Sequence, residues 1–324
     1  MNKILFSSLC IGELYLNWAV ICVRSVINAC GVLTTPITWE FCTTEEFEEL
    51  LKKRLEHFNI NNLQFIFTRI SAIDESIDYT KTNVFRFHKN DISKIFYWRI
   101  KHVNDLKEEQ KYNILVTVDL DSVFISNPFD KISEFITSGK TMCGTSQYMN
   151  LNEFYKNLKN YDIKKDVSLF PKTYINLGFA FLNLDKLPNN IYNYFKKIFP
   201  GNEYIFCTED ETFFNILVKD TEKEFTTIQL VSHAWKFSDI DSKDIKLVHF
   251  SPNSIDLLGK LTFKEMNYAL FIKTCYFDVL KSCADYEKEY IDENILCNIH
   301  KNSKIFERLK HCLTKFKKTQ KLKL

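Results

Sequence analysis

The sequence predicts an α/β fold built around a largely parallel sheet. Strand-like apolar runs alternate with amphipathic helical segments along most of the 324 residues. Hydrophobic side chains make up 45% of the chain and aromatic ones 15%, which is enough to bury a large core. The chain shows no internal repeat and no low-complexity linker. One large domain with an appendage is therefore expected.

The clearest predicted strands are short apolar runs bounded by polar or turn residues. They span residues 3–7, 63–70, 114–118, 178–184, 225–230 and 245–250. Between the first two, Thr43 and Glu46 have the spacing of a capping box and predict a helix start. The expected buried stripe of that helix comprises Phe47, Leu50, Leu51, Leu55 and Phe58.

The first ten residues resemble a short signal peptide, because Lys3 precedes an apolar stretch. Glu13 and Asn17 interrupt that stretch early, so a buried strand followed by a helix is the preferred interpretation. The expected buried face of the helix comprises Trp18, Ile21, Cys22, Ser25 and Val26. No uninterrupted apolar run has the length needed to span a bilayer.

The overall charge excludes a strong electrostatic argument for nucleic-acid binding. Forty-three Lys and Arg stand against 41 Asp and Glu, which leaves a formal net charge of +2. The ten cysteines are scattered, without a Cys-x-x-Cys pair or metal-ligand spacing. Reduced thiols and a cytoplasmic location are therefore expected.

The last segment, residues 297–324, contains nine Lys or Arg and a single acid, Glu307. Its apolar residues fall on one helical face: Ile305, Leu309, Cys312, Leu313 and Phe316. Such a helix can lie on an anionic membrane surface, for example the inner face of a membrane. The alternative is a terminal helix packed on the domain, and periodicity does not separate the two. The predicted division is a catalytic domain over 1–255 and a helical extension over 256–324.

Asp119 and Asp121 follow the predicted strand 114–118 directly. Two carboxylates at the carboxyl end of a strand predict a site for Mg²⁺ or Mn²⁺, since both ions prefer hard oxygen donors. In open sheets of this class, ligands bind outside the carboxyl ends of the strands. His249 closes another apolar strand and is a candidate third ligand, although a lone histidine there is more often structural.

Two further stretches have polar residues next to apolar runs. Asn176 and Gly178 precede a buried strand, where a glycine permits close approach of the backbone to a ligand. Thr208 and Glu211 read as a capping box at a helix start, which leaves Asp210 without a structural role.

The order of these pieces resembles the retaining glycosyltransferases of family 8, a group that includes glycogenin and bacterial lipopolysaccharide galactosyltransferases. The resemblance covers roughly the first 250 residues. Tyr15 resembles the tyrosine that stacks on the uracil, and Arg99 in Tyr97-Trp98-Arg99 resembles the arginine that reaches the donor.

Downstream, Asp119-Leu120-Asp121 resembles the metal motif of the family, with His249 at the place of the third metal ligand. Asn176-Leu177-Gly178 resembles the motif that binds the donor sugar. Asp210-Glu211, followed by Asn215, resembles an Asp-Gln pair and its following Asn.

The resemblance implies a GT-A fold and a metal-dependent hexosyltransferase. The expected cofactor is Mn²⁺ or Mg²⁺, the donor is a UDP-sugar, and the acceptor is a glycan or a lipid-linked hydroxyl. Arg99 and Asn176 are expected to orient the sugar, with Asp210 or Glu211 stabilising positive charge at the anomeric carbon. Same-face attack is favoured over a covalent intermediate, and both stay open.

The sequence also departs from the family pattern. Glu211 stands in place of the usual Gln, and 251–254 (Ser-Pro-Asn-Ser) stand where Gly and Lys-Pro-Trp usually follow the histidine. Lys260 lies too far along to replace that lysine. Two alternatives therefore remain: a haloacid dehalogenase-like phosphatase with Asp119 as nucleophile, and a non-catalytic nucleotide-sugar-binding protein.

Overall fold

The computed structural model describes residues 3–71, 90–124, 126–146, 175–200, 209–220, 225–227, 231–233 and 246–249. The basic tail, the extension 256–324, Thr208 and the segment after His249 lie outside these residues. The predicted domain boundary and the predicted membrane contact therefore remain predictions.

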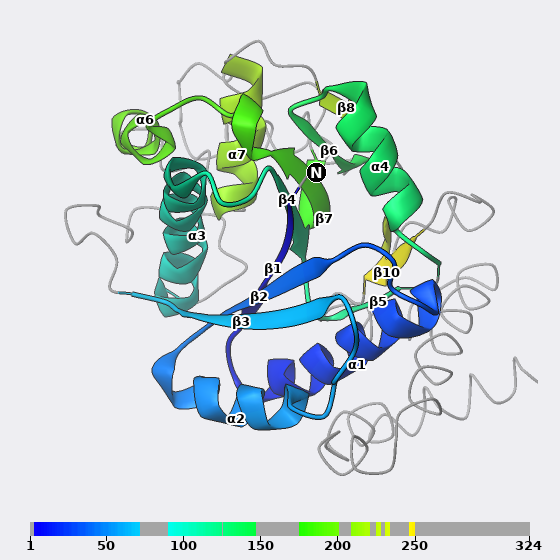
Figure 1. The fold of residues 1–324 in the computed structure, drawn as a ribbon. Coiled ribbons are helices and arrows are strands. Elements are labelled where there is room, and N and C mark those ends of the chain that lie inside the picture. The colour runs from blue at the N-terminus through cyan, green and yellow to red at the C-terminus, as the bar shows by residue number, and fades with distance from the viewer. Residues whose placement is uncertain are drawn as a thin grey trace, which may run out of the picture.

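The described part is built on a seven-stranded sheet with the order β3-β2-β1-β4-β7-β6-β8 (Figure 1). Its strands are β1 (Ile4–Cys10), β2 (Ile37–Thr43), β3 (Leu63–Arg69), β4 (Ile114–Val118), β6 (Met142–Ser146), β7 (Ile175–Asn183) and β8 (Phe225–Thr227). The neighbours β3, β2, β1 and β4 run parallel. β7 is antiparallel to both β4 and β6. The predicted α/β class with a mostly parallel sheet is confirmed.

A second, three-stranded sheet has the order β5-β10-β9. Its members are β5 (Ser122–Phe124), β9 (Val231–His233) and β10 (Leu247–His249). β10 is antiparallel to β5, and the pairing sets His249 opposite Ser122. A residue near the end of the described chain is thereby placed beside the segment that follows β4.

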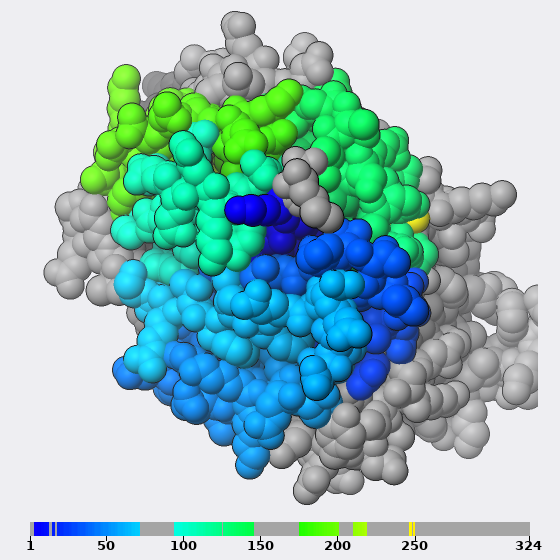
Figure 2. All heavy atoms as spheres, viewed as in Figure 1, coloured from blue at the N-terminus to red at the C-terminus, as the bar shows by residue number. Residues whose placement is uncertain are grey.

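Helices cover both faces of the large sheet (Figure 1). They are α1 (Glu13–Cys30), α2 (Glu45–Leu55), α3 (Asn90–Glu109), α4 (Phe129–Ser138), α6 (Ile191–Ile198) and α7 (Glu209–Asp220), with the short helix η3 (Leu184–Lys186). Side chains of α1, α2 and α4 share one core cluster, and those of α3, α6 and α7 share another. Figure 2 shows the start of β1 near the middle of one face, between residues 37–71 and 90–146, in keeping with its central position.

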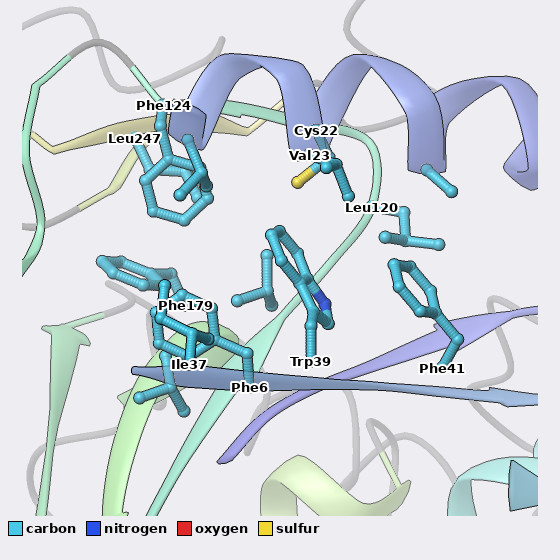
Figure 3. Close-up of a cluster of buried hydrophobic side chains, with 14 of the residues drawn as sticks. Phe6, Cys22, Val23, Ile37, Trp39, Phe41, Leu120, Phe124, Phe179 and Leu247 are labelled. Atoms are coloured by element: carbon cyan, nitrogen blue, oxygen red, sulfur yellow. The ribbon is translucent and has the colours of Figure 1, made fainter. Parts of the chain in front are cut away.

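The central strands bury both faces, which explains their continuous apolar runs. In β4, Val116 packs into the cluster under α1, and Leu115 packs into the cluster under α3. Figure 3 shows the first cluster, where Phe6, Trp39 and Phe41 of the sheet face the helix that carries Cys22 and Val23. The predicted buried face of α1 is confirmed, since Trp18, Ile21, Cys22, Ser25 and Val26 are all buried.

The predicted capping box at Thr43 was wrong. Thr43 is the last residue of β2, and its hydroxyl donates a hydrogen bond to the Cys10 carbonyl oxygen at 2.7 Å. The helix begins at Glu45 and has no side-chain cap; acids in its first turn complement the helix dipole instead. Leu50 was also misplaced, because it is 49% exposed whereas Leu51 is buried.

In the part of the chain that the structure describes, no helix is both long and apolar enough to cross a membrane. The cysteines described there, Cys10, Cys22, Cys30, Cys42 and Cys143, form no disulfide.

Candidate metal centre

The carboxyl end of β4 presents two carboxylates on one side of the chain. Leu120, between them, points into the core cluster with Trp39 and Phe41 (Figure 3) and is 1% exposed. Burial of this leucine turns Asp119 and Asp121 away from the core. The same alternation that buries a strand therefore gathers the two acids.

His249 completes a three-residue group with these acids. Its Nε2 lies 3.1 Å from Asp121 Oδ1 and 3.6 Å from Asp119 Oδ2. The ligand atoms of the three residues all lie within 4.8 Å of one another. The Asp119 side chain is 35% exposed, whereas those of His249 and Asp121 are 10% and 8% exposed. The group is therefore buried at His249 and Asp121 and accessible to solvent at Asp119. A metal ion that also binds a substrate needs such an accessible side.

β7 runs antiparallel to β4, so its first residues lie beside the last residues of β4. The Asp119 amide donates a hydrogen bond of 2.7 Å to the Gly178 carbonyl oxygen. A Cβ atom at position 178 would lie 2.8 Å from Asp119 Oδ2 and 3.1 Å from His249 Cε1. It would also lie 2.7 Å from Asn176 Oδ1. A side chain at position 178 would displace the Asp119 carboxylate, the Asn176 amide or the His249 ring, whereas a glycine leaves them in place.

Gly178→Ala is therefore expected to weaken Mn²⁺ binding by about 10–100-fold, the usual range for disturbing groups that orient metal ligands. Titration of the metal-free protein with Mn²⁺, followed by the electron paramagnetic resonance of the free ion, measures this directly. Circular dichroism checks that the variant is folded. A folded variant with wild-type affinity would show that the added methyl group does not reach the ligands.

Arg99 of α3 and Asp210 of α7 form a buried ion pair next to this centre. Arg99 Nε lies 2.8 Å from Asp210 Oδ2, and the two side chains are 8% and 4% exposed. Burial raises the pKa of Asp210 to about 6; the Arg99 charge opposes this shift and the Asp119 charge adds to it. Asp210 is therefore ionised above about pH 6 and is electrostatically coupled to Asp119 of the candidate metal centre.

Glu211, the next residue on α7, holds the start of β7. Its Oε2 accepts hydrogen bonds of 2.9 Å from Asn176 Nδ2 and from the Leu177 amide. Asn176 Oδ1 in turn accepts a bond of 2.9 Å from the Gly178 amide. Asn215 adds a pair of bonds to the backbone of Ile175, at 2.7 and 2.8 Å. Glu211 and Asn215 of α7 thus hold in place the segment Asn176-Leu177-Gly178, which the sequence predicts to bind the donor sugar.

Tyr15 lies in the first turn of α1 and is half-buried. Burial raises the pKa of Tyr15 above its usual range, and the charges of Asp121 and Asp119 raise it further. The tyrosine predicted to stack on a base therefore lies close enough to the acids to feel their charge.

Sequence reasoning missed Thr117. Its hydroxyl donates a hydrogen bond of 2.6 Å to the Leu177 carbonyl oxygen, which ties β4 to the start of β7. A hydroxyl inside an otherwise apolar strand, directly before the acids, was the signal available for it.

His249 binds a proton tightly when no metal is present. Burial lowers the pKa of His249, but the Asp121 charge and hydrogen bond, with the Asp119 and Glu211 charges, outweigh it and raise this pKa to about 9. A metal ion needs the neutral imidazole and must displace this proton.

Mn²⁺ binding is accordingly expected to release about one proton near pH 7.5, with affinity rising about tenfold per pH unit below the His249 pKa. Lower pH disfavours the metal because the proton and the ion compete for Nε2. Calorimetric titrations in buffers of different ionisation enthalpy count the released protons. A pH-independent affinity with no proton release would mean that His249 is not a ligand.

No protein-family model and no curated protein sequence matches the chain. Its fold, however, matches solved structures. Mouse xyloside xylosyltransferase 1, in its apo form, superimposes with a TM-score of 0.55 at 13% identity, over 78% of this chain and 99% of that one. The chain therefore has the GT-A fold. The galactosyltransferase LgtC, in complex with donor and acceptor sugar analogues, gives a TM-score of 0.49 at 15% identity, over 78% and 88% of the two chains.

The structure brings together most residues that the sequence singled out. The centre consists of Asp119, Asp121 and His249. Gly178 lies against it, together with Asn176. Through the contacts given above, the surrounding residues include Arg99, Asp210 and Glu211. Lys260 and the segment 251–254 lie outside the described residues.

Proposed function

We propose that the chain is a metal-dependent retaining glycosyltransferase that moves a hexose from a nucleotide sugar, with UDP as the expected nucleotide, to a hydroxyl of a glycan or lipid-linked acceptor. The observation that carries this proposal is the convergence of Asp119, Asp121 and His249, which are far apart in sequence, at one strand end of a GT-A fold.

The donor set fits the proposed ion. Two carboxylates and one imidazole suit Mn²⁺, and also Mg²⁺, better than a soft metal. The ion, when bound, would neutralise the charge that develops on the diphosphate leaving group. Asp119, Asp121 and His249 would hold it, and the exposed edge of Asp119 leaves room for phosphate oxygens.

The protein's own groups then have distinct tasks in this proposal. Arg99 supplies a fixed positive charge near the donor, held in place by Asp210. Asn176 orients the sugar, and Glu211 holds Asn176 through its amide group. The buried Asp210 carboxylate supplies the negative charge that favours oxocarbenium character, and it is ionised at neutral pH.

Two substitutions of Glu211 distinguish a positioning role from a nucleophilic role. A glutamine would keep an oxygen acceptor for Asn176 and Leu177 but would lose nucleophilicity. If Glu211 acts by positioning, Glu211→Gln should retain turnover within about tenfold, whereas Glu211→Ala should lose about 100-fold or more, as removal of an oriented hydrogen bond does. Steady-state donor consumption by the two variants decides between the roles. A Glu211→Gln variant as inactive as Glu211→Ala would instead favour the covalent intermediate.

The proposed activity is tested by incubating the purified chain with Mn²⁺ and a panel of nucleotide sugars. Slow hydrolysis of one donor is expected, with loss of turnover on chelation and recovery on readdition of Mn²⁺. Hydrolysis of a generic aryl phosphate without use of any nucleotide sugar would favour the phosphatase. A nucleotide sugar that raises the melting temperature without being consumed would favour the binding protein. Contact of the tail with a membrane stays part of the proposal.

A further inference from the structure

A second group of ligand-type side chains lies on the opposite face of β2 from Trp39 and Phe41. Glu40 and Cys42 of β2 meet His102 of α3, and their ligand atoms all lie within 4.8 Å of one another. Glu40 is 2% exposed and Cys42 is 1% exposed. Alternation along β2 explains the placement, since Trp39 and Phe41 fill the core under α1. The donor-site chemistry proposed above uses none of these three residues.

The group is compact. Glu40 Oε2 lies 2.9 Å from His102 Nε2, and Ser7 Oγ lies 3.0 Å from Glu40 Oε2 and 3.7 Å from Cys42 Sγ. The ligands of a tetrahedral Zn²⁺ stand about 3.3–3.6 Å apart, as its bond lengths of about 2.0–2.3 Å require. Between two of the proposed ligands, Glu40 Oε2 and His102 Nε2, the distance of 2.9 Å is shorter than that range. An ion would therefore replace the Glu40–His102 hydrogen bond and move these two side chains about 0.4 Å apart.

The surroundings hold these side chains in place. Thr68 donates a hydrogen bond of 2.7 Å to Glu40 Oε1, and Ser7 donates one to Oε2. The Trp98 ring stacks on the His102 ring, with centroids 4.8 Å apart and planes 8° apart. Groups of this kind orient metal ligands in known sites.

We propose that Glu40, Cys42 and His102 bind a Zn²⁺ ion between β2 and α3, with a water molecule as the fourth ligand of the tetrahedron. A thiolate and an imidazole favour Zn²⁺ over the Mg²⁺ or Mn²⁺ that suits Asp119 and Asp121. One thiolate and one carboxylate also neutralise the two charges of the ion, so the buried centre carries no net charge. His102, with 11% of its side chain exposed, is the most exposed of the three ligands.

The proposed zinc site lies close to Arg99 along α3. Arg99 lies one helical turn before His102 on α3, and an ion bound between α3 and β2 would fix the part of the helix that carries Arg99. The zinc site rests on its own ligands and stands whether or not the chain transfers a sugar.

The test uses metal-free protein that carries Asp121→Asn, so that the first centre is weakened. Addition of Co²⁺ as a spectroscopic probe is expected to produce one equivalent of binding with a thiolate-to-cobalt charge-transfer band. Zn²⁺ should displace the Co²⁺ and remove the band. A folded Asp121→Asn protein without this band would show that Glu40 and His102 form a hydrogen-bonded core only, and the proposal would be overturned.

Matched variants in the same background locate the ion. Cys42→Ser should abolish the charge-transfer band. It should weaken Co²⁺ binding by more than the factor of about 10–100 that is typical when a residue orienting a metal ligand is changed. Cys143 is another buried cysteine, and Cys143→Ser should leave the band and the Co²⁺ affinity unchanged. His102→Gln retains the thiol, so its weaker Co²⁺ binding provides a second check if Cys42→Ser does not fold. Wild-type binding in His102→Gln, or loss of the band in Cys143→Ser, would contradict the assignment.

Discussion

Asp121→Ala is expected to reduce Mn²⁺-dependent donor hydrolysis by about 1000-fold or more, because in the proposed mechanism the ion would provide most of the leaving-group stabilisation. Asp121 has 8% of its side chain exposed and is the nearer of the two acids to His249 Nε2, at 3.1 Å. Its removal would leave only Asp119 and His249 to hold the proposed ion. Titration with Mn²⁺ and turnover at saturating donor separate lost binding from lost catalysis.

Asp105→Ala is the matched control for this change. Asp105 forms an exposed ion pair with Lys101 on the surface of α3, where both side chains are 42% exposed. Surface changes of this kind are expected to alter stability by no more than about 0.5 kcal/mol and to leave turnover unchanged. Full activity of Asp121→Ala would show that the catalytic metal is held elsewhere, or that none is needed.

Asp210→Ala is expected to lower the free energy of unfolding by about 3–5 kcal/mol at pH 7.5, the range for removing one partner of a buried ion pair. The Arg99 guanidinium would stay buried beside Phe96 without its counter-charge. Urea unfolding followed by fluorescence measures the loss. A decrease below about 1 kcal/mol would mean that solvent or another acid takes the place of Asp210.

The double variant Asp210→Ala with Arg99→Met separates stability from activity. Methionine fills a volume similar to that of the arginine stem and carries no charge, so much of the lost stability should return. Turnover should stay low, because the variant lacks both charges that the proposal places near the donor: the positive charge of Arg99 and the negative charge of Asp210. Recovery of both would show that the pair has a structural role only.

Much of the centre was predictable because it is local in sequence. The apolar run 114–118 is a strand with the predicted bounds, and the two acids follow it directly. Period-two alternation was enough to place Asp119 and Asp121 on one side, with Leu120 buried between them. The predicted roles of these residues came from the resemblance, which the fold supports at the level of architecture.

The other features of the fold and the site depend on contacts between segments that are far apart in the sequence. β2 was missed because its last residue, Thr43, mimics a helix cap with Glu46, while its hydroxyl in fact bonds the backbone of β1. The antiparallel direction of β7 is not encoded in its apolar run, yet it alone brings Gly178 beside Asp119. Likewise, the pairing of Arg99 with Asp210 depends on how α3 packs against α7.

The most direct test of the central claim is the effect of Mn²⁺ on the affinity for UDP, measured by calorimetry. If Asp119, Asp121 and His249 hold an ion that binds the diphosphate, Mn²⁺ should tighten UDP binding by about tenfold or more, equivalent to about 1.4 kcal/mol. The ion should leave uridine binding unchanged and should have no effect on UDP binding by Asp121→Ala. Equal UDP affinity with and without Mn²⁺ in the wild-type protein would contradict the account.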